Sequence, residues 1–404
     1  MRNRLRTATL AAASHQNGGD MAYRYVILGA GLQGRAAAFD LALRGEAESI
    51  VLADQDPSQV QEAQRWLAEQ TGFDAFLPSV LDARDEARTR EVIRGCDVAI
   101  SCLPYWMHPL VFPAAAAEGV SLIDMGGDTD EARETLARDE TARQAGITVV
   151  TDAGLAPGLG NLLAGWLIDR CESASSALVF CGGLPVSPMP PFGYRLVFNV
   201  SGLISEYADI AYVLRDGAIK AIPSLTEAQR VEFPEVGELE AFVTSGGSGT
   251  APWTFQGRVE NYEYKTLRYP GHFDKMKLFK DCGFWSTDPL FLDGQEIVPR
   301  SVFESVIEPV LKRGEGSDQV LLLVEVAGRA GNRNFVRLRE FADEARGLSA
   351  MQRMTAFPTA IAAHEIARGS LAKGCVPFES GLPGDLMMEA LVRRGISFEV
   401  SLEG

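Results

Sequence analysis

The stretch Tyr25-Val-Ile-Leu-Gly-Ala-Gly-Leu-Gln-Gly34 decides the fold, because an apolar run ends there in three spaced glycines and passes directly into the alanine-rich segment Arg35 to Leu43. This order predicts a strand, a tight turn and a helix. The first glycine permits the turn, the second lets backbone N–H groups approach a pyrophosphate, and the third lets the helix pack on the strand. The helix N-terminus then attracts the phosphate charge. The predicted cofactor-binding residues of this turn are Gly29, Gly31, Leu32, Gln33 and Gly34.

A carboxylate follows at the position where such domains bind the adenosine ribose. A second apolar run, Ser49 to Ala53, ends in Asp54, where a carboxylate would hydrogen-bond a ribose hydroxyl. It would also repel a 2'-phosphate, and no Arg or Lys occurs from residue 55 to residue 64 to accept one. The sequence therefore favours NAD over NADP. Two plainer interpretations stay open: the glycines can form a purely structural turn, and Asp54 can simply begin the turn that ends at Pro57.

Length and composition bound the class of protein. At 404 residues the chain has room for two domains with a large buried core. Its formal net charge of -16 argues against nucleic acid and anionic membranes as partners, because both require a positive field. No apolar stretch is long enough to span a bilayer. We therefore expect a small-molecule ligand.

Cysteine and histidine usage predicts no metal site. The six cysteines occur without any Cys-x-x-Cys, and the four histidines lie too far apart for a ligand cluster. Most of the cysteines sit in apolar runs, as expected for small core residues of a protein in a reducing, cytoplasmic compartment. Residues 1–20 loosely resemble a signal or transit peptide, but the apolar run is short and no clear cleavage site precedes Met21. We expect a disordered tail or an upstream-start extension there.

Apolar runs alternate with helical patterns up to residue 152, which predicts a Rossmann-type, doubly wound parallel sheet. One helix is expected over 129–145. In such sheets ligands sit beyond the carboxyl ends of the strands. The residues that follow the predicted strands, and that should point toward the cofactor or substrate, are Pro104, Tyr105, Asp124, Gly126 and Asp152.

From Gly154 the pattern changes to strand-like runs separated by Gly/Pro clusters, which predicts a second domain of mixed or antiparallel type. One such run is Tyr194 to Val200. Two late runs, 319–328 and 334–340, predict a hairpin, and a helix over 359–371 is expected to return to the first domain. We therefore assign residues 1–20 to a disordered tail, 21–152 plus 350–404 to an NAD-binding domain, and 153–349 to a substrate domain.

Motifs spread over most of the chain resemble the saccharopine dehydrogenase family, and within it the L-lysine 6-dehydrogenases most closely. The resemblance runs from about Tyr23 to about Glu379. It rests above all on Asp152-Ala-Gly-Leu-Ala-Pro-Gly158 and Tyr264-Lys-Thr-Leu-Arg-Tyr-Pro-Gly-His272. The other matching segments are Ser101–Tyr105, Asp124–Gly127, Cys181–Pro185, Ser201–Tyr207 and Met354–Pro358.

The resemblance implies a nucleotide-binding domain, an inserted saccharopine-dehydrogenase-like α+β catalytic domain, an active site in the cleft between them, and a homodimer formed through the second domain. This chain also departs from part of the family. Members of the saccharopine-forming type carry Asp where this chain has Ala156, and Asn-Arg-Asp where it has Ser245-Gly246-Gly247. Those polar groups suit a second amino-acid moiety, so their absence points to a smaller substrate.

An amine dehydrogenase has to position and deprotonate an amine, because the nicotinamide itself performs the hydride step. A lysine ε-ammonium has a reference pKa of about 10.4, so presenting it neutral at pH 7 costs about 4 to 5 kcal/mol unless the site shifts that pKa. Asp152 is the first candidate to face the amine, since the family carries an acidic residue there and a predicted strand ends there. The alternative is a helix cap or turn former. For Asp124 we expect a structural or cofactor-orienting role.

Lys265, Arg268 and His272 form the densest cationic group of the second domain. A guanidinium binds a carboxylate through two hydrogen bonds, which makes Arg268 a candidate for the α-carboxylate of an amino acid. Lys265 would add charge or assist proton transfer, and His272 would shuttle protons near neutral pH. The plain alternative is an ordinary strand with one solvated face. Cys181 and Tyr105 are weaker substrate-binding candidates, with burial in the core as the alternative.

The leading hypothesis is an NAD-dependent L-lysine 6-dehydrogenase that forms allysine, which cyclises to piperideine-6-carboxylate, together with NADH and ammonia. A second hypothesis is a dehydrogenase of the saccharopine or carboxyspermidine type, which joins an amine to a carbonyl compound and reduces the imine. A third is a catalytically silent dinucleotide sensor, against which Asp152 and the Lys265 to His272 group argue.

Overall fold

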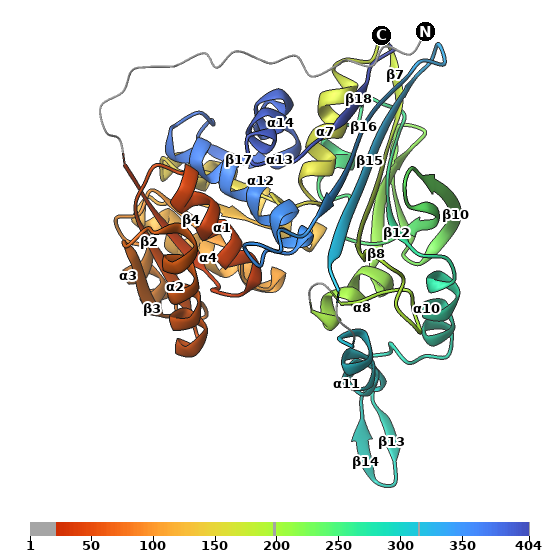
Figure 1. Ribbon diagram of the computed structural model, residues 1–404, viewed down its shortest axis with the longest axis horizontal. Helices are drawn as coiled ribbons and strands as arrows, with labels where there is room; N and C mark the ends of the chain where they lie inside the picture. The colour runs from red at the N-terminus through yellow and green to blue at the C-terminus, as the bar shows by residue number, and fades with distance from the viewer. Residues whose placement is uncertain (1–21, 197–198, 314–315, 404) are drawn as a thin grey trace.

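The computed structural model describes residues 22–196, 199–313 and 316–403. These residues form two large sheets, with helices between the sheets and on their outer faces (Figure 1). The tail expected over residues 1–20 lies outside the described residues. No described helix is both long enough and apolar enough to cross a membrane.

The first sheet is parallel and carries the glycine-rich turn. Its strands are β1 (Tyr23–Leu28), β2 (Ala47–Asp54), β3 (Phe76–Val80), β4 (Val98–Ser101), β5 (Ser121–Asp124), β6 (Thr148–Thr151) and β17 (Gly374–Pro377). Their order is β17-β6-β5-β4-β1-β2-β3. The chain thus winds outward from β1 in both directions, and the predicted doubly wound fold is confirmed. Strands β4, β5 and β6 are buried along their whole length, as expected of parallel strands covered on both faces.

Helices cover this sheet between its strands. They are α1 (Leu32–Arg44), α2 (Pro57–Thr71), α3 (Glu86–Ile93), a short 3-10 turn η1 (Tyr105–Met107), α4 (His108–Glu118), α5 (Thr129–Leu136) and α6 (Asp139–Gln144). The segment 129–145, expected as one helix, is therefore two helices. The break falls at Ala137 and Arg138, between the C-terminus of α5 and the N-cap of α6.

The second sheet is mixed. Its strands are β7 (Ala174–Pro185), β8 (Ile210–Arg215), β9 (Ala218–Pro223), β10 (Thr226–Phe233), β11 (Gly237–Val243), β12 (Asn261–Arg268), β15 (Asp318–Gly328), β16 (Arg333–Phe341) and β18 (Glu399–Ser401). The main path is β10-β11-β12-β7-β15-β16-β18, in which only β12 and β7 pair in parallel. The predicted hairpin is present as β15 and β16.

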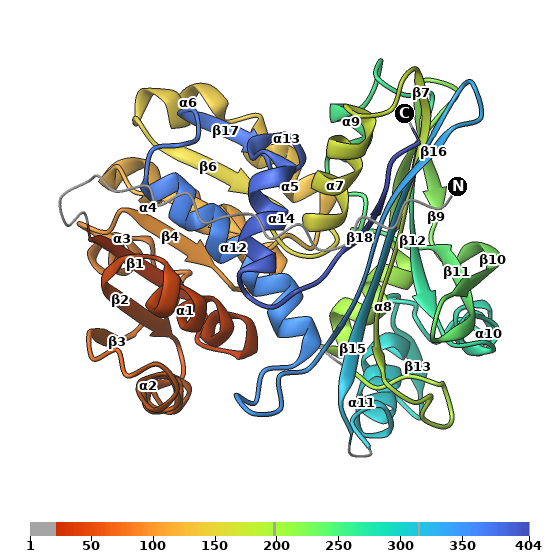
Figure 2. The same cartoon turned by 45° about the horizontal axis from the view of Figure 1, so that its top comes forward.

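The remaining elements join the two sheets or extend the second. They are α7 (Leu159–Ile168), α8 (Val200–Ala208), α9 (Ala251–Thr254), α10 (His272–Asp281), β13 (Leu290–Leu292), β14 (Gln295–Ile297), α11 (Pro299–Leu311), α12 (Ala350–Ala367), α13 (Phe378–Gly381) and α14 (Gly384–Val392). Helices α7 and α12 lie between the two sheets (Figure 2). Strands β13 and β14 form a hairpin that projects from the molecule beyond α11 (Figure 1).

Two expectations about the second domain need correction. The run Tyr194 to Val200 is not a strand: residues 194–196 have no regular structure, residues 197 and 198 are outside the described part, and Val200 begins α8. The C-terminal residues also do not all stay with the first sheet. Strand β18 pairs with β16, from Arg337 opposite Glu399 to Phe335 opposite Ser401, and so returns the chain to the second sheet.

The start of α12 connects the two parts of the molecule. Ser349 and Gln352 form a capping box at this N-terminus. The carboxylate of Asp318, on β15 of the second sheet, accepts hydrogen bonds from the N–H groups of Ala350 and Met351 at 2.8 and 3.0 Å. Gln352 Nε2 donates to Leu32 O in the glycine-rich turn at 2.8 Å. The second sheet is thereby joined through α12 to the turn expected to hold the cofactor.

Candidate active site

The glycine-rich turn has the geometry that a dinucleotide site requires. Gly29 has a φ of +100°, and a Cβ there would lie 2.8 Å from Cys102 O. A Cβ at Gly34 would overlap Gly29 O, so the turn and α1 can approach only without a side chain. A Cβ at Gly31 would meet nothing within 4 Å, and this residue caps α1 without a side-chain hydrogen bond. The space and the N–H groups beside Gly31 therefore fit a pyrophosphate.

Asp54 stabilises the turns at the ribose end of this site. Its Oδ2 accepts from Ala30 N at 2.9 Å, and its Oδ1 accepts from Asp56 N at 3.0 Å. Arg35, near the start of α1, donates to Ala30 O, to Gln59 Oε1 and to Glu62 Oε1. Arg35 therefore places a positive charge beside the same loops, although no Arg or Lys occurs from residue 55 to residue 64. The ion pair with Glu62 neutralises this charge.

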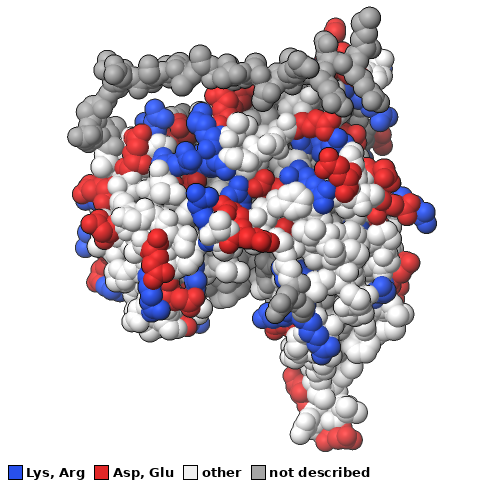
Figure 3. Space-filling view, viewed as in Figure 1, with Lys and Arg blue, Asp and Glu red and all other residues white. Residues whose placement is uncertain are grey.

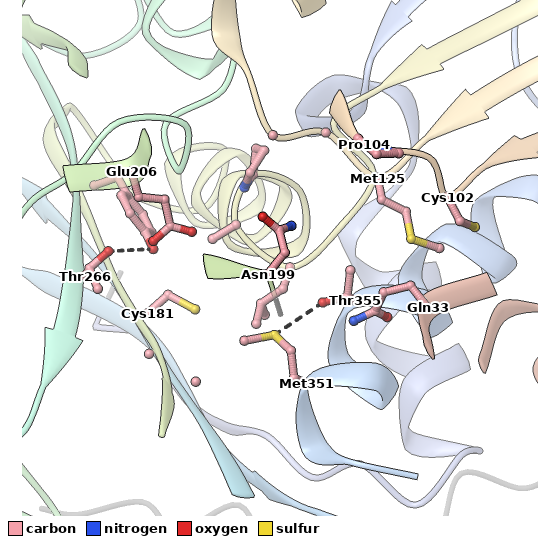
Figure 4. Close-up of a pocket in the computed structure, with 18 of the residues that line it drawn as sticks. Gln33, Cys102, Pro104, Met125, Cys181, Asn199, Glu206, Thr266, Met351 and Thr355 are labelled. Carbon is pink, nitrogen blue, oxygen red and sulfur yellow. Dashed lines mark hydrogen bonds between the residues drawn. The ribbon is translucent and has the colours of Figure 1, made fainter. Parts of the chain in front are cut away.

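A cavity of about 390 Å³ opens between the two sheets, and the molecular surface is indented between the two lobes (Figure 3). Figure 4 shows Gln33, Cys102, Pro104 and Met125 on one side of this pocket and Cys181, Glu206 and Thr266 on the other, with Asn199 between them. Met351 and Thr355 of α12 line it as well. This volume is typical of a small-molecule site. Gln33 Oε1 is buried and lacks a hydrogen-bond partner among the described residues.

Strand β12 supplies only alternate side chains to the pocket. Tyr264, Thr266 and Arg268 line it, whereas Lys265 points to the other face of the sheet. There Lys265 Nζ donates to Glu227 O at 3.2 Å and to Gln229 Oε1 at 3.0 Å. The expectation that Lys265 works beside Arg268 therefore fails, because residues three apart on a strand lie on opposite faces.

Arg268 is held by a chain of hydrogen bonds that ends at His272. Phe192 O can only accept, so His272 Nδ1 donates to it at 3.0 Å and His272 Nε2 is the acceptor for Tyr207 Oη at 3.0 Å. Tyr207 Oη in turn accepts from Arg268 Nε at 2.8 Å. Burial, and then the charge of Arg268, lower the pKa of His272 to about 3. His272 is thus a neutral positioning residue outside the pocket and not a proton shuttle near neutral pH.

Asp152 lies beside the pocket and does not line it. It lines a separate small cavity of about 10 Å³, with Tyr105, His108 and Asp124 among its neighbours. A Cβ at Gly126 would clash with Asp152 Oδ1, which shows how closely that backbone covers the carboxyl. The backbone of Asp152 is in the left-handed region, with φ 62°. The expectation that it faces the amine is not met in this geometry.

The carboxyl of Asp152 is also unusual electrostatically. Neither oxygen has a hydrogen-bond partner among the described residues. Burial, followed by the charges of Asp124, Glu379 and Asp128, raises its pKa well above the usual range of an aspartate. Asp124 forms the adjoining turn, because its Oδ1 accepts from Gly126 N at 2.8 Å and from Asp152 N at 3.0 Å.

Of the other two predicted substrate-binding residues, one lines the main pocket and the other lines the small cavity beside Asp152. Cys181 lines the main pocket, and burial raises the pKa of its thiol to about 12, so it is a neutral wall residue. Tyr105 lines the small cavity beside Asp152 and packs close to the backbone of Gly127. All six cysteines are free, and no described group of three or more His, Cys, Asp or Glu side chains is arranged to hold a metal ion.

Glu206 is the pocket residue that the sequence analysis did not single out. It lies on α8, and its Oε2 is 3.9 Å from Arg268 Nη2. Burial raises the pKa of Glu206 to about 7, against the lowering effect of Arg268. Glu206 belongs to the segment Ser201–Tyr207, which matches the family but contains no residue that we predicted to act in the site. The segment is apolar and helix-like, and nothing in its local pattern shows that one carboxyl turns toward Arg268.

Comparisons with known proteins show the family of the chain. The sequence model described as the saccharopine dehydrogenase C-terminal domain matches residues 154–396, and the model described as the saccharopine dehydrogenase NADP binding domain matches residues 25–150. A saccharopine dehydrogenase (NADP(+), L-glutamate-forming) from Pyricularia oryzae is 27% identical over 260 residues, which are 61% of this chain and 56% of that protein. The match therefore spans little more than half of that relative.

Solved structures show the same architecture. Apo saccharopine dehydrogenase (L-Glu forming) from Saccharomyces cerevisiae superposes with a TM-score of 0.75 at 20% identity, covering 94% of this chain and 100% of that one. A homospermidine synthase from Legionella pneumophila, in complex with NAD, has a TM-score of 0.64 at 14% identity and covers 94% of this chain and 91% of that one. These two likenesses concern the fold. With both domain models matched in order along one chain, the family predicted from the motifs is confirmed: the chain belongs to the saccharopine dehydrogenase family.

Proposed function

We propose that this protein is an NAD-dependent dehydrogenase that oxidises the carbon bearing the ε-amine of L-lysine. The products are allysine, which cyclises to piperideine-6-carboxylate, NADH and ammonia. The balance is one ε-ammonium group, one NAD and one water giving one aldehyde, one NADH, one ammonium ion and one proton. The family and the dinucleotide-type turn support an oxidoreductase, and the pocket supports the choice of substrate.

The distribution of charge in the pocket is the observation that carries this proposal. Among the lining residues that the structure describes, only Glu206 and Arg268 are charged, and they lie together on the wall formed by the second domain. The residues contributed by the first domain and α12 are apolar or neutral. A linear substrate with a charged head group and a distant amine matches this arrangement, with its amine near the glycine-rich turn.

The lining residues also support a substrate smaller than saccharopine. Ala156 lines the pocket with a methyl group where the saccharopine-forming type has a carboxylate. Gly247 is packed so closely against Tyr264 that a Cβ would overlap the phenol ring. Position 156 of the pocket therefore lacks a carboxylate. Residue 247 does not line the pocket, and with Tyr264 in this place it has no room for a side chain.

The chain's own residues can bind the substrate and prepare its amine. Arg268, oriented by Tyr207, can hold the α-carboxylate through the guanidinium. At the other end, burial among neutral side chains lowers the pKa of an amine, which favours the unprotonated form that the reaction needs. When bound, NAD would accept the hydride from the carbon that carries this amine.

Turnover of L-lysine tests the proposal against the other chemistry of the family. NADH and ammonia are measured with NAD and L-lysine, in parallel with saccharopine and a panel of amines that includes ornithine and cadaverine. We expect equal amounts of NADH and ammonia from L-lysine. NADH from saccharopine and none from L-lysine would instead mean that the chain acts on a condensed substrate.

We also propose NAD as the preferred cofactor. The support is Asp54 at the end of β2 and the pairing of Arg35 with Glu62, which compensates the charge of this arginine. Measuring kcat/KM with each cofactor should show a preference for NAD of at least about tenfold. A preference for NADP would indicate that Arg35 leaves Glu62 and binds the 2'-phosphate.

A further inference from the structure

We propose that Glu206 and Arg268 together form a recognition site for the head group of an α-amino acid with a free α-amine, in which Arg268 binds the α-carboxylate and Glu206 binds the α-ammonium. This inference rests on the proposed function and adds to it. In this assignment Glu206 binds the α-amino acid head group of the substrate, which is the end that does not react.

The distance between the two side chains suits this role. Arg268 Nη2 and Glu206 Oε2 are 3.9 Å apart, which is too long for a hydrogen bond. The carboxylate and the ammonium of an α-amino acid are attached to one carbon, so their binding partners have to be neighbours of opposite charge. The carboxylate of the ligand would lie against Arg268 and its ammonium against Glu206. Binding would not have to break a hydrogen bond between these two side chains.

Both side chains keep free hydrogen-bonding capacity. Within the described residues, Arg268 donates Nε to Tyr207 Oη and Nη1 to Leu267 O, and Nη2 makes no hydrogen bond there. The Glu206 carboxylate makes no hydrogen bond in the same part of the chain, and about a third of its side chain is open to the cleft, at 34% exposure. A ligand with an ammonium group can therefore reach it.

The backbone that carries Glu206 is held on both sides. Asn199 caps the start of α8 by accepting from Gly202 N at 2.6 Å. Near the end of this helix, Ser245 N donates to Glu206 O at 2.9 Å, and Ser245 Oγ donates to Ser205 O at 3.1 Å. Arg268 is fixed through Tyr207 and His272. Such preorganisation reduces the entropy lost when a ligand is bound.

The position of the pair also argues against Glu206 as the base for the reacting amine. Glu206 lies on the wall of Thr266 and Cys181, across the pocket from Pro104, Met125 and Gln33 (Figure 4). The nicotinamide has to lie on the side of the first domain, where the strands of the parallel sheet end. A head group held at Glu206 directs the far amine of lysine toward that side.

The test compares two ligands that differ only in the α-amine. L-norleucine has an α-carboxylate, an α-ammonium and an apolar chain, whereas hexanoate lacks the amine. Their dissociation constants are measured by titration calorimetry on the full chain in the presence of NADH. The variants are Glu206→Gln and, as the matched control, Asp209→Asn, which removes a carboxylate from the exposed C-cap of α8 outside the pocket.

The wild type should bind L-norleucine at least about tenfold more tightly than hexanoate, which is the effect of one charge-assisted hydrogen bond. Glu206→Gln should remove that preference and should still bind hexanoate at least as tightly as the wild type does, which also shows that the pocket is still folded. Asp209→Asn should behave as the wild type. A wild type that does not bind L-norleucine or does not prefer it, or a Glu206→Gln variant that keeps the preference, would overturn the inference.

The result of this binding experiment is distinguishable from the result of the L-lysine turnover experiment. If L-norleucine binding depends on Glu206 but L-lysine is not oxidised, the head-group site stands and the proposed reaction fails. If L-lysine is oxidised and Glu206→Gln keeps its preference for L-norleucine, only the head-group assignment fails.

Discussion

Burial raises the pKa of the Asp152 carboxyl well above its usual range, and this affects stability. As pH rises above about 4, the unfolded chain therefore ionises Asp152 before the folded chain does. The stabilising contribution of this group is therefore full at low pH and is lost as pH rises. We predict that Asp152→Asn is more stable than the wild type at pH 7, by at least about 1 kcal/mol.

Urea unfolding of the ligand-free protein between pH 4 and pH 8 measures this effect. Asparagine tolerates the positive φ of this position as well as aspartate does. The difference between variant and wild type should shrink toward zero near pH 4. A variant that is less stable than the wild type at pH 7 would show that Asp152 is ionised and hydrogen-bonded in the folded state.

His272 acts on the site through Tyr207 and Arg268. We predict that His272→Phe, which removes the acceptor for Tyr207 Oη, raises KM for L-lysine by roughly tenfold, equivalent to about 1.4 kcal/mol, with little change in kcat. Steady-state kinetics from pH 6 to pH 8 checks this. A proton shuttle would instead lose roughly 100-fold or more in kcat, and imidazole added to the variant would restore activity.

Single-residue roles differ in how far the sequence predicts them. The functions of Gly29 and Gly34 follow from local geometry, because each glycine's contacts lie in the turn itself or at the end of the neighbouring strand. The neutral state of His272 does not follow, since it depends first on the burial of this side chain, where its hydrogen-bond partners Phe192 and Tyr207 are remote in the sequence. The burial of Asp152 likewise depends on the backbone of Gly126 and Gly249.

At the scale of elements, the hydrogen bonds that join β15 to the start of α12 contribute to the free energy of unfolding. Asp318 is almost fully buried and accepts two hydrogen bonds from the first turn of α12. We predict that Asp318→Ala lowers the free energy of unfolding by about 1–3 kcal/mol, because the buried N–H of Ala350 and the partly buried N–H of Met351 lose their acceptor. Urea unfolding measures it, and Asp281→Ala, in an exposed pair with Lys277, is the control that should stay within about 0.5 kcal/mol. Equal losses in both variants would contradict a specific role for this junction.

The elements of the second domain were only partly predictable. The hairpin of β15 and β16 follows from two adjacent apolar runs. The run Tyr194 to Val200 is apolar without being a strand, because Tyr194 and Val200 pack into the second core as a loop and a helix start. The sequence alone could have placed Lys265 and Arg268 on opposite faces of β12. In an ordinary strand successive side chains alternate between the two faces, and these residues are three positions apart.

At the scale of the whole molecule, the first sheet follows from the alternation of strands and helices, because parallel strands need crossover connections. The order of the second sheet does not follow. Its central strand β7 pairs with β15, where Cys181 lies opposite Leu322, and with β12, and such long-range pairing leaves no mark in local sequence. The cleft between the sheets, and the meeting of Glu206 with Arg268 inside it, are consequences of that pairing. The homodimer stays a prediction.

The activity of the whole enzyme should rise with pH. In water near pH 7 the ε-amine of L-lysine is mostly in the ammonium form, but hydride transfer needs the neutral amine, whose reference pKa is about 10.4. Glu206, with a pKa of about 7, is also more fully ionised above neutral pH. We predict that kcat/KM for L-lysine increases from pH 7 to an alkaline optimum, checked by initial rates of NADH formation. A flat profile from pH 7 to pH 10 would count against amine deprotonation as the controlling step.

The most direct test of the account is to ask which nitrogen of L-lysine is released. L-lysine labelled with nitrogen-15 at the ε-amine is incubated with the protein and NAD, and the ammonia is analysed by mass spectrometry together with the NADH formed. The account predicts fully labelled ammonia in a one-to-one ratio with NADH. Unlabelled ammonia would show that the α-amine reacts, and an absence of ammonia and NADH from L-lysine would show that the substrate is a different one.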